Sequence, residues 1–369
     1  MIYFDYAATT PVDSDVLDFY NKITKEYPGN INSPHQLGID ANRVYLDSIN
    51  TLASLINVKP GSLTITSGAT ESNNLAINGL IKAYPNRHRH ILSIKLSHPS
   101  VITVLDHLTD FKVSYLNLDQ DGRINLTDLE EALLEKPLLL TIPALDSELG
   151  IIQDLTAISN LLAKHQTFFH IDATQIFNKT KINFKLFDLI SWSPHKYFGP
   201  KGIGYLYVRP NLTLKPIIKG GTNQLLRGGT IPLPLVAAGA KASLKALENI
   251  EQYSNLESLS NRITSMLATY PNVVLNHTKY SHPAFINFSI PGVKSATLVN
   301  AFSRHGIYLS ARSACSGSDQ YSASVLALTN DQTLASSSVR LTISLLTTEE
   351  EVNTFLAVFD QVYHQLRSD

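Results

Sequence analysis

The sequence predicts an α/β protein: a large domain built on a mostly parallel β-sheet with helices on both faces, and a smaller C-terminal α+β domain. Two observations support this fold class. Between about residues 60 and 210, apolar runs typical of buried strands alternate with stretches of helical periodicity, which is the pattern of βα units. A chain of 369 residues is also longer than one compact domain usually requires.

The alternation can be followed in chain order. Each predicted strand is a run of four to six mostly apolar residues, and several of these runs lead into patterns with apolar residues three or four positions apart. The predicted strands span residues 62–66, 91–94, 138–142, 168–171, 189–192 and 203–208, and the helical patterns lie around residues 75–81, 101–108 and 155–162. Functional groups of such sheets gather where strands end and helices begin.

The C-terminal part has its own elements. A long helical stretch over residues 241–270 is expected to link it to the large domain, and strands are predicted at 285–288 and 339–343. A final helix follows Thr348, because Thr348 and Glu351 have the spacing of a capping box in which each side chain satisfies a free backbone N–H group.

Composition narrows the class of protein. Hydrophobic residues make up 44% and charged residues 17%, and the formal net charge is −1, so neither nucleic acid nor a membrane surface is expected as a partner. No apolar run approaches the roughly 18 residues of a membrane span, and the first residues do not resemble a signal peptide, so we expect a cytoplasmic protein. The single cysteine, Cys315, excludes an intramolecular disulfide and a thiolate zinc cluster, and no metal site is predicted.

Two strand ends carry the strongest chemical signal. Asp172 ends the apolar run 168–171, and Lys196 lies on a turn after the run 189–192, before a segment rich in glycine and proline. Lysines normally lie on solvated helix faces, so a lysine here is expected to point into a cleft. Pyridoxal phosphate requires this pair: a lysine binds its aldehyde covalently, and a carboxylate keeps its pyridine nitrogen protonated. The pair therefore predicts an enzyme that uses this cofactor.

Other strand ends add groups that suit the same cofactor. Ser67-Gly68-Ala69-Thr70 follows a strand and opens a helix, where free N–H groups and the helix dipole favour a phosphate. Alone, such a turn is more often structural. Ser193 and His195, beside the lysine, are candidates for further phosphate contacts, and His98 follows another strand, where it suits ring stacking and proton transfer or, alternatively, simple solvent exposure.

Three further features allow two interpretations each. Arg340, within an apolar strand, suits either a substrate carboxylate or an internal salt bridge. The glycine-rich segment 227–230 is either a plain turn or a loop that brings the hydroxyl of Thr230 to a phosphate across a subunit boundary. Cys315 lies in a small, polar stretch, which favours an exposed and reactive thiol over a buried one.

With these residues assembled, the chain resembles cysteine desulfurases of the NifS/IscS type, in the class V aminotransferase group of fold-type I enzymes. The resemblance runs nearly end to end and combines several motifs that are specific together. They are residues 3–11 (YFDYAATTP), 29–35 (GNINSPH), 66–74 (TSGATESNN), 98–99 (HP), 170–175 (HIDATQ), 193–196 (SPHK) and 338–340 (SVR).

The resemblance implies a role for each matching residue. Lys196 binds pyridoxal 5'-phosphate, Asp172 pairs with its pyridine nitrogen and Gln175 approaches its phenolic oxygen, while His98 stacks on the ring and acts as an acid and base. The phosphate contacts implied are Thr70, Ser193, His195 and, from the partner subunit of a homodimer, Thr230, and Ala69 is a further cofactor contact. Arg340 and Ser147 face the substrate L-cysteine, and Cys315 is the nucleophile that takes its sulfur, leaving L-alanine.

The resemblance also implies an organisation and a pathway. Residues 12–253 form the large cofactor-binding domain, and residues 1–11 with 254–369 form the small domain that carries Cys315. The spacing from Cys315 to 325–326 matches the subgroup associated with iron–sulfur cluster assembly and tRNA thiolation. A sulfur-acceptor protein, either a scaffold or a tRNA thiolase, is then the expected partner.

The chain departs from the family pattern at three places. Ser147 stands where the family has an asparagine that contacts cofactor and substrate, Ser97 stands where a glutamate often precedes the histidine, and residues 222–225 replace a Gln-Glu-Arg-Gly loop. Two alternatives therefore stay open: a related lyase or transaminase with another amino-acid substrate, and a degenerate relative that binds the cofactor without turnover.

Overall fold

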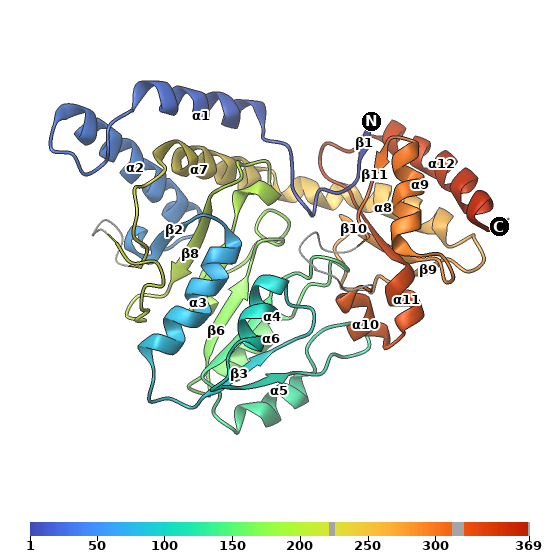
Figure 1. The fold of residues 1–369 in the computed structure, drawn as a ribbon, viewed down its shortest axis with the longest axis horizontal. Helices are drawn as coiled ribbons and strands as arrows, with labels where there is room; N and C mark the ends of the chain where they lie inside the picture. The colour runs from blue at the N-terminus through green and yellow to red at the C-terminus, as the bar shows by residue number, and fades with distance from the viewer. Residues whose placement is uncertain (221–225, 312–320, 368–369) are drawn as a thin grey trace.

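The structure is a computed structural model that describes residues 1–220, 226–311 and 321–367 (Figure 1). A seven-stranded sheet lies at its centre, in the order β2-β8-β7-β6-β5-β3-β4. Its strands are β2 (Leu63–Thr66), β3 (His90–Ser93), β4 (Lys112–Tyr115), β5 (Leu139–Pro143), β6 (Phe168–Asp172), β7 (Leu189–Trp192) and β8 (Gly204–Val208). All neighbours are parallel except β8, which is antiparallel to both β2 and β7. The predicted mostly parallel α/β sheet is confirmed.

Helices cover both faces of this sheet because successive side chains of each strand point to opposite faces. Leu139 and Leu189 pack with α3 (Ala69–Ala83) and α4 (Pro99–Asp106) in one core cluster. Their neighbours Leu140 and Ile190 belong to the cluster on the other face, which includes residues of α2 (Gln36–Leu55), α5 (Leu126–Leu133), α6 (Leu155–Leu162) and α7 (Leu233–Glu248). The strands are therefore apolar on both sides, as buried parallel strands require.

The helix expected over residues 241–270 is interrupted, and that prediction is wrong in this respect. Helix α7 ends before Asn249, whose side-chain amide donates to the carbonyl oxygen of Lys245 at 2.9 Å. A short 3₁₀ segment, Ile250–Asn255, separates it from α8 (Leu256–Leu267). The Lys245 carbonyl also accepts from the backbone N–H of Asn249 at 3.2 Å, so both donors of Asn249 close the last turn of α7. Helix α1 (Ser14–Glu26) and α2 both pack against α7.

Two smaller sheets lie beside the large one. Strands β12 (Ser338–Thr342), β10 (Phe285–Ser289) and β9 (Val274–Leu275) are antiparallel, while β1 (Ile2–Tyr3) pairs in parallel with β11 (Ile307–Tyr308). Their strands come from the segments predicted to form a small domain; the domain boundaries themselves stay a prediction. The helices of this part are α8, α9 (Ser295–Arg304), α10 (Ala323–Thr329), α11 (Gln332–Ser337) and α12 (Glu349–Arg367).

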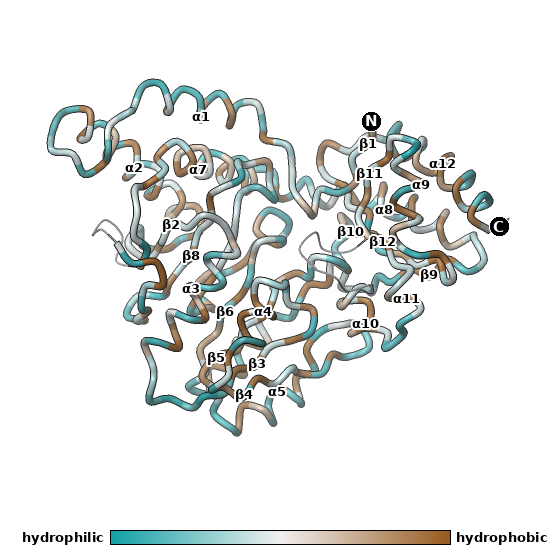
Figure 2. Tube along the Cα trace, in the orientation of Figure 1, coloured by the Kyte–Doolittle hydropathy of each residue, from teal (hydrophilic) through white to brown (hydrophobic). Residues whose placement is uncertain are grey.

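The predicted capping box at the last helix is present. The Thr348 N–H donates to Glu351 Oε2 at 3.0 Å, and the Glu351 N–H donates to Thr348 Oγ1 at 3.2 Å. Hydrophobic residues gather along the central strands and α7, and hydrophilic ones along the outer loops (Figure 2). In the described part of the chain, no helix combines the length and apolar character needed to cross a bilayer.

Candidate active site

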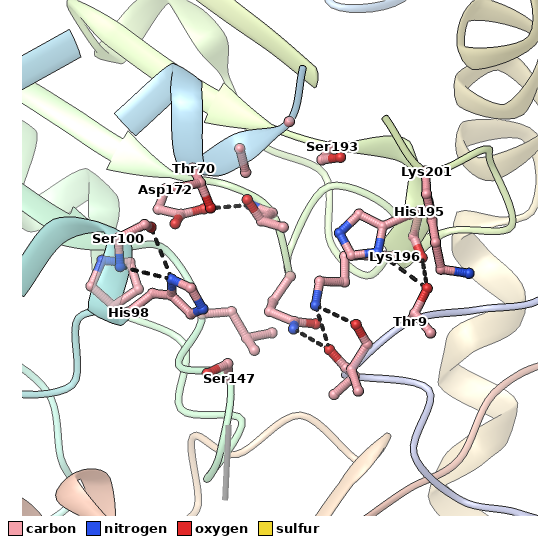
Figure 3. Close-up of a pocket in the computed structure, with 18 of the residues that line it drawn as sticks. Thr9, Thr70, His98, Ser100, Ser147, Asp172, Ser193, His195, Lys196 and Lys201 are labelled. Atoms are coloured by element: carbon pink, nitrogen blue, oxygen red, sulfur yellow. Dashed lines mark hydrogen bonds between the residues drawn. The ribbon is translucent and has the colours of Figure 1, made fainter. Parts of the chain in front are cut away.

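A cavity of about 370 Å³ lies at the edge of the large sheet where β2, β5, β6 and β7 end and β8 begins. Because the parallel strands share one direction, the residues that follow them meet at this edge. Figure 3 shows the labelled side chains converging on this space from the turns after the strands and from the N-terminal segment. The predicted residues that line it are Ala69, Thr70, His98, Ser147, Asp172, Gln175, Ser193, His195, Lys196 and Arg340.

Lys196 ends a short 3₁₀ turn (Pro194–Lys196) that follows β7. Its Nζ donates to the carbonyl oxygens of Ala7 and Ala8, at 2.8 Å each. Gln175 Nε2 also donates to the Ala7 carbonyl, at 2.9 Å. The N-terminal segment therefore holds two of the predicted site residues at one point of the cavity wall.

Asp172 is fixed by donors on both of its carboxylate oxygens. The Thr174 N–H donates to Oδ1 at 2.9 Å, and Asn73 Nδ2, from the buried face of α3, donates to Oδ2 at 2.8 Å. Asn73 Nδ2 also donates to Ser100 Oγ at 2.9 Å, and Ser100 Oγ lies 2.8 Å from Nδ1 of His98. A chain of hydrogen bonds thus runs from the carboxylate through Asn73 to the histidine.

Both histidines of the cavity are held in the neutral form. Burial lowers the pKa of His98 below its usual 6.5, reinforced by Lys196 and opposed by Asp172. Burial, together with the positive charges of Lys196 and Lys201, lowers the pKa of His195 to about 3. The Ser100 N–H donates to Nδ1 of His98 at 3.1 Å, so the ring proton of this histidine lies on Nε2.

The turn between β2 and α3 presents the start of a helix to the cavity. Gly68 occupies the N-cap position and no side chain of the described residues caps the helix there, so the first N–H groups of α3 are available to an anion. This turn packs closely on β8: a Cβ at Gly204 would lie 2.4 Å from the Gly68 carbonyl carbon. Ser193 lies beside it, donating from Oγ to the Ile203 carbonyl at 2.7 Å.

Arg340 reaches the cavity from β12 and is 1% exposed. Its Nη2 contacts Asp5 Oδ1 at 2.7 Å, and its Nη1 donates to the Ser147 carbonyl oxygen at 2.7 Å. The internal salt bridge weighed from the sequence is therefore present, and Nε is buried without a hydrogen-bond partner in the structure as described. Arg340 lines the cavity, so its binding of a substrate carboxylate stays a prediction.

Three predicted features are not found among the described residues that line the cavity. Thr230 is exposed and is not part of the cavity lining in the single chain as described. Cys315 and residues 222–225 lie outside the described residues. Sequence reasoning also missed Asn73, Ser100, Lys201 and Asp5. The sequence does contain a signal for Asn73: it is a polar residue on the apolar face of α3, in line with the buried Ile77 and Leu80.

Comparison with known proteins identifies the family. The model of the class-V aminotransferase family matches residues 2–355. The chain is 36% identical over 382 residues to the mitochondrial cysteine desulfurase of Candida maltosa, which covers 99% of this chain and 78% of that protein. Among solved structures, a NifS-like protein superposes with a TM-score of 0.92 at 30% identity over the whole of both chains. SspA in complex with cysteine gives a TM-score of 0.81 at 29% identity, covering 93% of this chain and 99% of that one.

The chain therefore belongs to the class-V aminotransferase family, a group of pyridoxal-phosphate-dependent enzymes, and within it to the cysteine desulfurases. The predicted family, fold class and enzyme class are confirmed.

Proposed function

We propose that the protein is a cysteine desulfurase that converts L-cysteine to L-alanine with pyridoxal 5'-phosphate as its cofactor, and that Cys315 receives the sulfur as a persulfide. The observation that carries this proposal is the meeting of Lys196, Asp172 and Gln175 in one cavity formed at the ends of different strands. The family relationship supports the substrate, since SspA is described in complex with cysteine.

The described residues fit the cofactor. Asp172 is oriented by two donors, as a partner of a pyridine nitrogen must be. Two buried oxygens beside it, Gln175 Oε1 and Thr174 Oγ1, have no hydrogen-bond partner in the described structure, although buried polar atoms are normally paired. A polar cofactor in this cavity would supply the missing partners.

Each part of the cofactor has a set of residues suited to hold it. Lys196 would bind the aldehyde covalently, Asp172 would pair with the ring nitrogen, and Gln175 would contact the phenolic oxygen. Thr70, Ser193 and His195 would hold the phosphate at the start of α3, together with Thr230 of the second subunit in a homodimer, and Ala69 would be a further cofactor contact. Once bound, the cofactor draws electron density from the α- and β-carbons of an attached amino acid.

The protein's own groups then position the substrate and move protons. The Arg340 guanidinium, held by Asp5, binds the substrate carboxylate, and Ser147 lines the same wall. The substrate amine would displace Lys196 from the cofactor, and the freed Lys196 amine would then remove the α-proton of the substrate. Neutral His98 exchanges a proton with the substrate at Nε2, a role that its low pKa permits at neutral pH.

The sulfur is transferred to Cys315. The Cys315 thiolate attacks the substrate sulfur and a sulfur–sulfur bond forms. The carbon–sulfur bond of the substrate breaks, its electron pair stays on the β-carbon, and that carbon takes up a proton to become the methyl group of alanine. The balance is L-cysteine plus a thiol on the enzyme giving L-alanine plus a persulfide on the enzyme.

The persulfide is passed to an acceptor protein for iron–sulfur cluster assembly or tRNA thiolation. The homodimer, the choice of acceptor and a cytoplasmic location stay predictions from the sequence. An electrophoretic assay of persulfide transfer to purified candidate acceptors would distinguish the two pathways.

Absorbance and product analysis test the proposal. The protein mixed with pyridoxal phosphate is expected to show a visible band that changes on addition of L-cysteine, with alanine and sulfide formed in a tube containing a reductant. Lys196→Ala is expected to abolish the covalent band, and Cys315→Ala to abolish sulfide release. Lys164→Ala, which changes an exposed lysine elsewhere, serves as the matched control.

Each contrary result has a definite meaning. A band that ignores L-cysteine would favour a different amino-acid substrate or an inactive relative. Sulfide release that survives Cys315→Ala would favour a lyase that does not use this thiol. No band in the unaltered protein would refute the role of Lys196.

A further inference from the structure

Two buried carboxyl groups beside the active site have no part in the chemistry proposed above. Asp146 and Glu148 flank Ser147 on the turn after β5, and they are 0% and 5% exposed. Burying carboxyl groups costs free energy unless donors compensate for lost water. Their partners therefore indicate what they do.

Their partners lie at the start of α10, directly after the segment that contains Cys315. Ser324 Oγ donates to Asp146 Oδ1 at 2.9 Å, and Ser322 Oγ donates to Glu148 Oε2. Ser322 is also the N-cap of α10, accepting from the Val325 N–H at 3.1 Å. Both serines are buried, so these bonds are shielded from competition by water.

The turn itself is held by hydrogen bonds to both the side chain and the backbone of Asp146. Asp146 Oδ2 accepts from the backbone N–H groups of Glu148 and Leu149, and the Gly150 N–H donates to the Asp146 carbonyl at 3.1 Å. The Asp146 carboxyl therefore holds the turn with one oxygen and α10 with the other. Figure 3 shows Ser147 of this turn on the cavity wall.

The chain before Cys315 is tied to the same turn by another route. Ser310 and Arg340 exchange both backbone hydrogen bonds, at 3.0 and 2.6 Å. Arg340 Nη1 then donates to the carbonyl oxygen of Ser147. Described residues on both sides of Cys315 in the sequence are thus connected to the turn 146–148.

We propose that Asp146 and Glu148 are positioning residues, which fix the start of α10 to the cavity wall and so set the reach of Cys315 toward the bound substrate. The inference rests on the proposed transfer of sulfur to Cys315. It gives a function to the carboxyls on either side of Ser147, the residue that stands where the family has an asparagine. The pair acts through Ser322 and Ser324, and neither carboxyl is among the described residues that line the cavity.

The experiment compares the double variant Ser322→Ala/Ser324→Ala with the unaltered holoenzyme. Persulfide formation on Cys315 in a single turnover, followed by mass spectrometry, is expected to slow at least tenfold. Affinity for pyridoxal phosphate, titrated by absorbance, is expected to stay within twofold. Ser295→Ala, which removes a serine hydrogen bond at the start of α9, is the matched control and is expected to behave as the unaltered protein.

Substitution of the carboxyls separates charge from hydrogen bonding. Asp146→Asn and Glu148→Gln keep an acceptor oxygen and are expected to retain the single-turnover rate, whereas Asp146→Ala and Glu148→Ala are expected to lose at least tenfold. Amide hydrogen exchange of residues 322–329 in the protein without cofactor gives a readout that does not depend on activity. The serine double variant is expected to exchange at least tenfold faster there.

Two results would overturn the inference. Equal single-turnover rates in the serine double variant and the unaltered protein would show that the anchor does not set the reach of Cys315. Unchanged hydrogen exchange in residues 322–329 would show that the bonds do not hold α10. An unaltered protein that binds the cofactor but forms no persulfide would instead refute the proposed function, and the inference with it.

Discussion

Replacing Asn73 by alanine tests the hydrogen-bond chain that organises the candidate site. The Asn73 side chain is 0% exposed and donates both to Asp172 Oδ2 and to Ser100 Oγ. A hydrogen bond to a charged group contributes about 1.5–3 kcal/mol and a neutral one about 1 kcal/mol. Asn73→Ala is therefore expected to lower the free energy of unfolding by about 2.5–4 kcal/mol, because Asp172 loses its donor on Oδ2 and Ser100 loses its donor on Oγ.

Urea unfolding followed by circular dichroism measures this loss, and the neighbouring residue supplies a matched control. Asn74 lies on the same helix, and its side chain donates to the Thr70 carbonyl at 2.9 Å near the surface. Asn74→Ala makes the same chemical change and is expected to cost less than about 1 kcal/mol, since water replaces the lost bond and alanine favours the helix. Equal unfolding midpoints for the two variants would refute the idea that Asn73 organises the site.

Two further predictions concern pH and packing. Acidification is expected to lower the free energy of unfolding, because burial lowers the pKa of three histidines from 6.5 to about 3 or 4: His170, His195 and His282. As the pH falls below about 6.5, these histidines take up protons in the unfolded chain but not in the folded protein, which lowers the free energy of unfolding. Asp146 has the opposite effect: its pKa is raised to about 7 in the folded protein, so the folded protein takes up one proton that the unfolded chain does not. The net slope is about 3 kcal/mol per pH unit near pH 5, and equal urea midpoints at pH 7 and pH 5 would contradict it. Gly204→Ala is expected to destabilise the protein by about 1–3 kcal/mol and to weaken pyridoxal phosphate binding, because the new Cβ meets the backbone of Gly68; unchanged stability and affinity would show that the turn tolerates displacement.

The sheet was predictable from the sequence because its strands are apolar on both faces, and so was the cluster of strand-end residues. Asp172 ends one strand of the sheet and Lys196 follows the parallel neighbouring strand, so both lie at the same edge whatever the conformation of the loops. The direction of β8 was not stated, although a signal existed. β7 and β8 are separated by the short segment between Trp192 and Gly204 without a crossover helix, and a parallel connection needs a dozen or more residues, usually with a helix.

The contacts that complete the site join residues far apart in the chain, and local patterns do not encode them. Arg340 pairs with Asp5 across 335 positions, and Asn73 meets Asp172 across 99. A buried arginine on a strand shows that a partner is needed without saying which one. The interruption after α7 was missed although a signal existed, because asparagine favours helix ends and turns over helix interiors, and Asn249 is the residue at which α7 ends.

The electrostatics of the site follow from which groups are buried and which are paired. Burial keeps His98 and His195 neutral, so neither adds a fixed charge to the site. Fixed charge comes from Asp172, which has two donors, and from Arg340, which is paired with Asp5. The Asp172 carboxylate and the Arg340 guanidinium are thus oriented before the ring nitrogen and the substrate carboxylate bind. Such preorganisation lowers the free-energy cost of orienting these groups when substrate binds, and it explains why the supporting residues lie as deep as the groups they support.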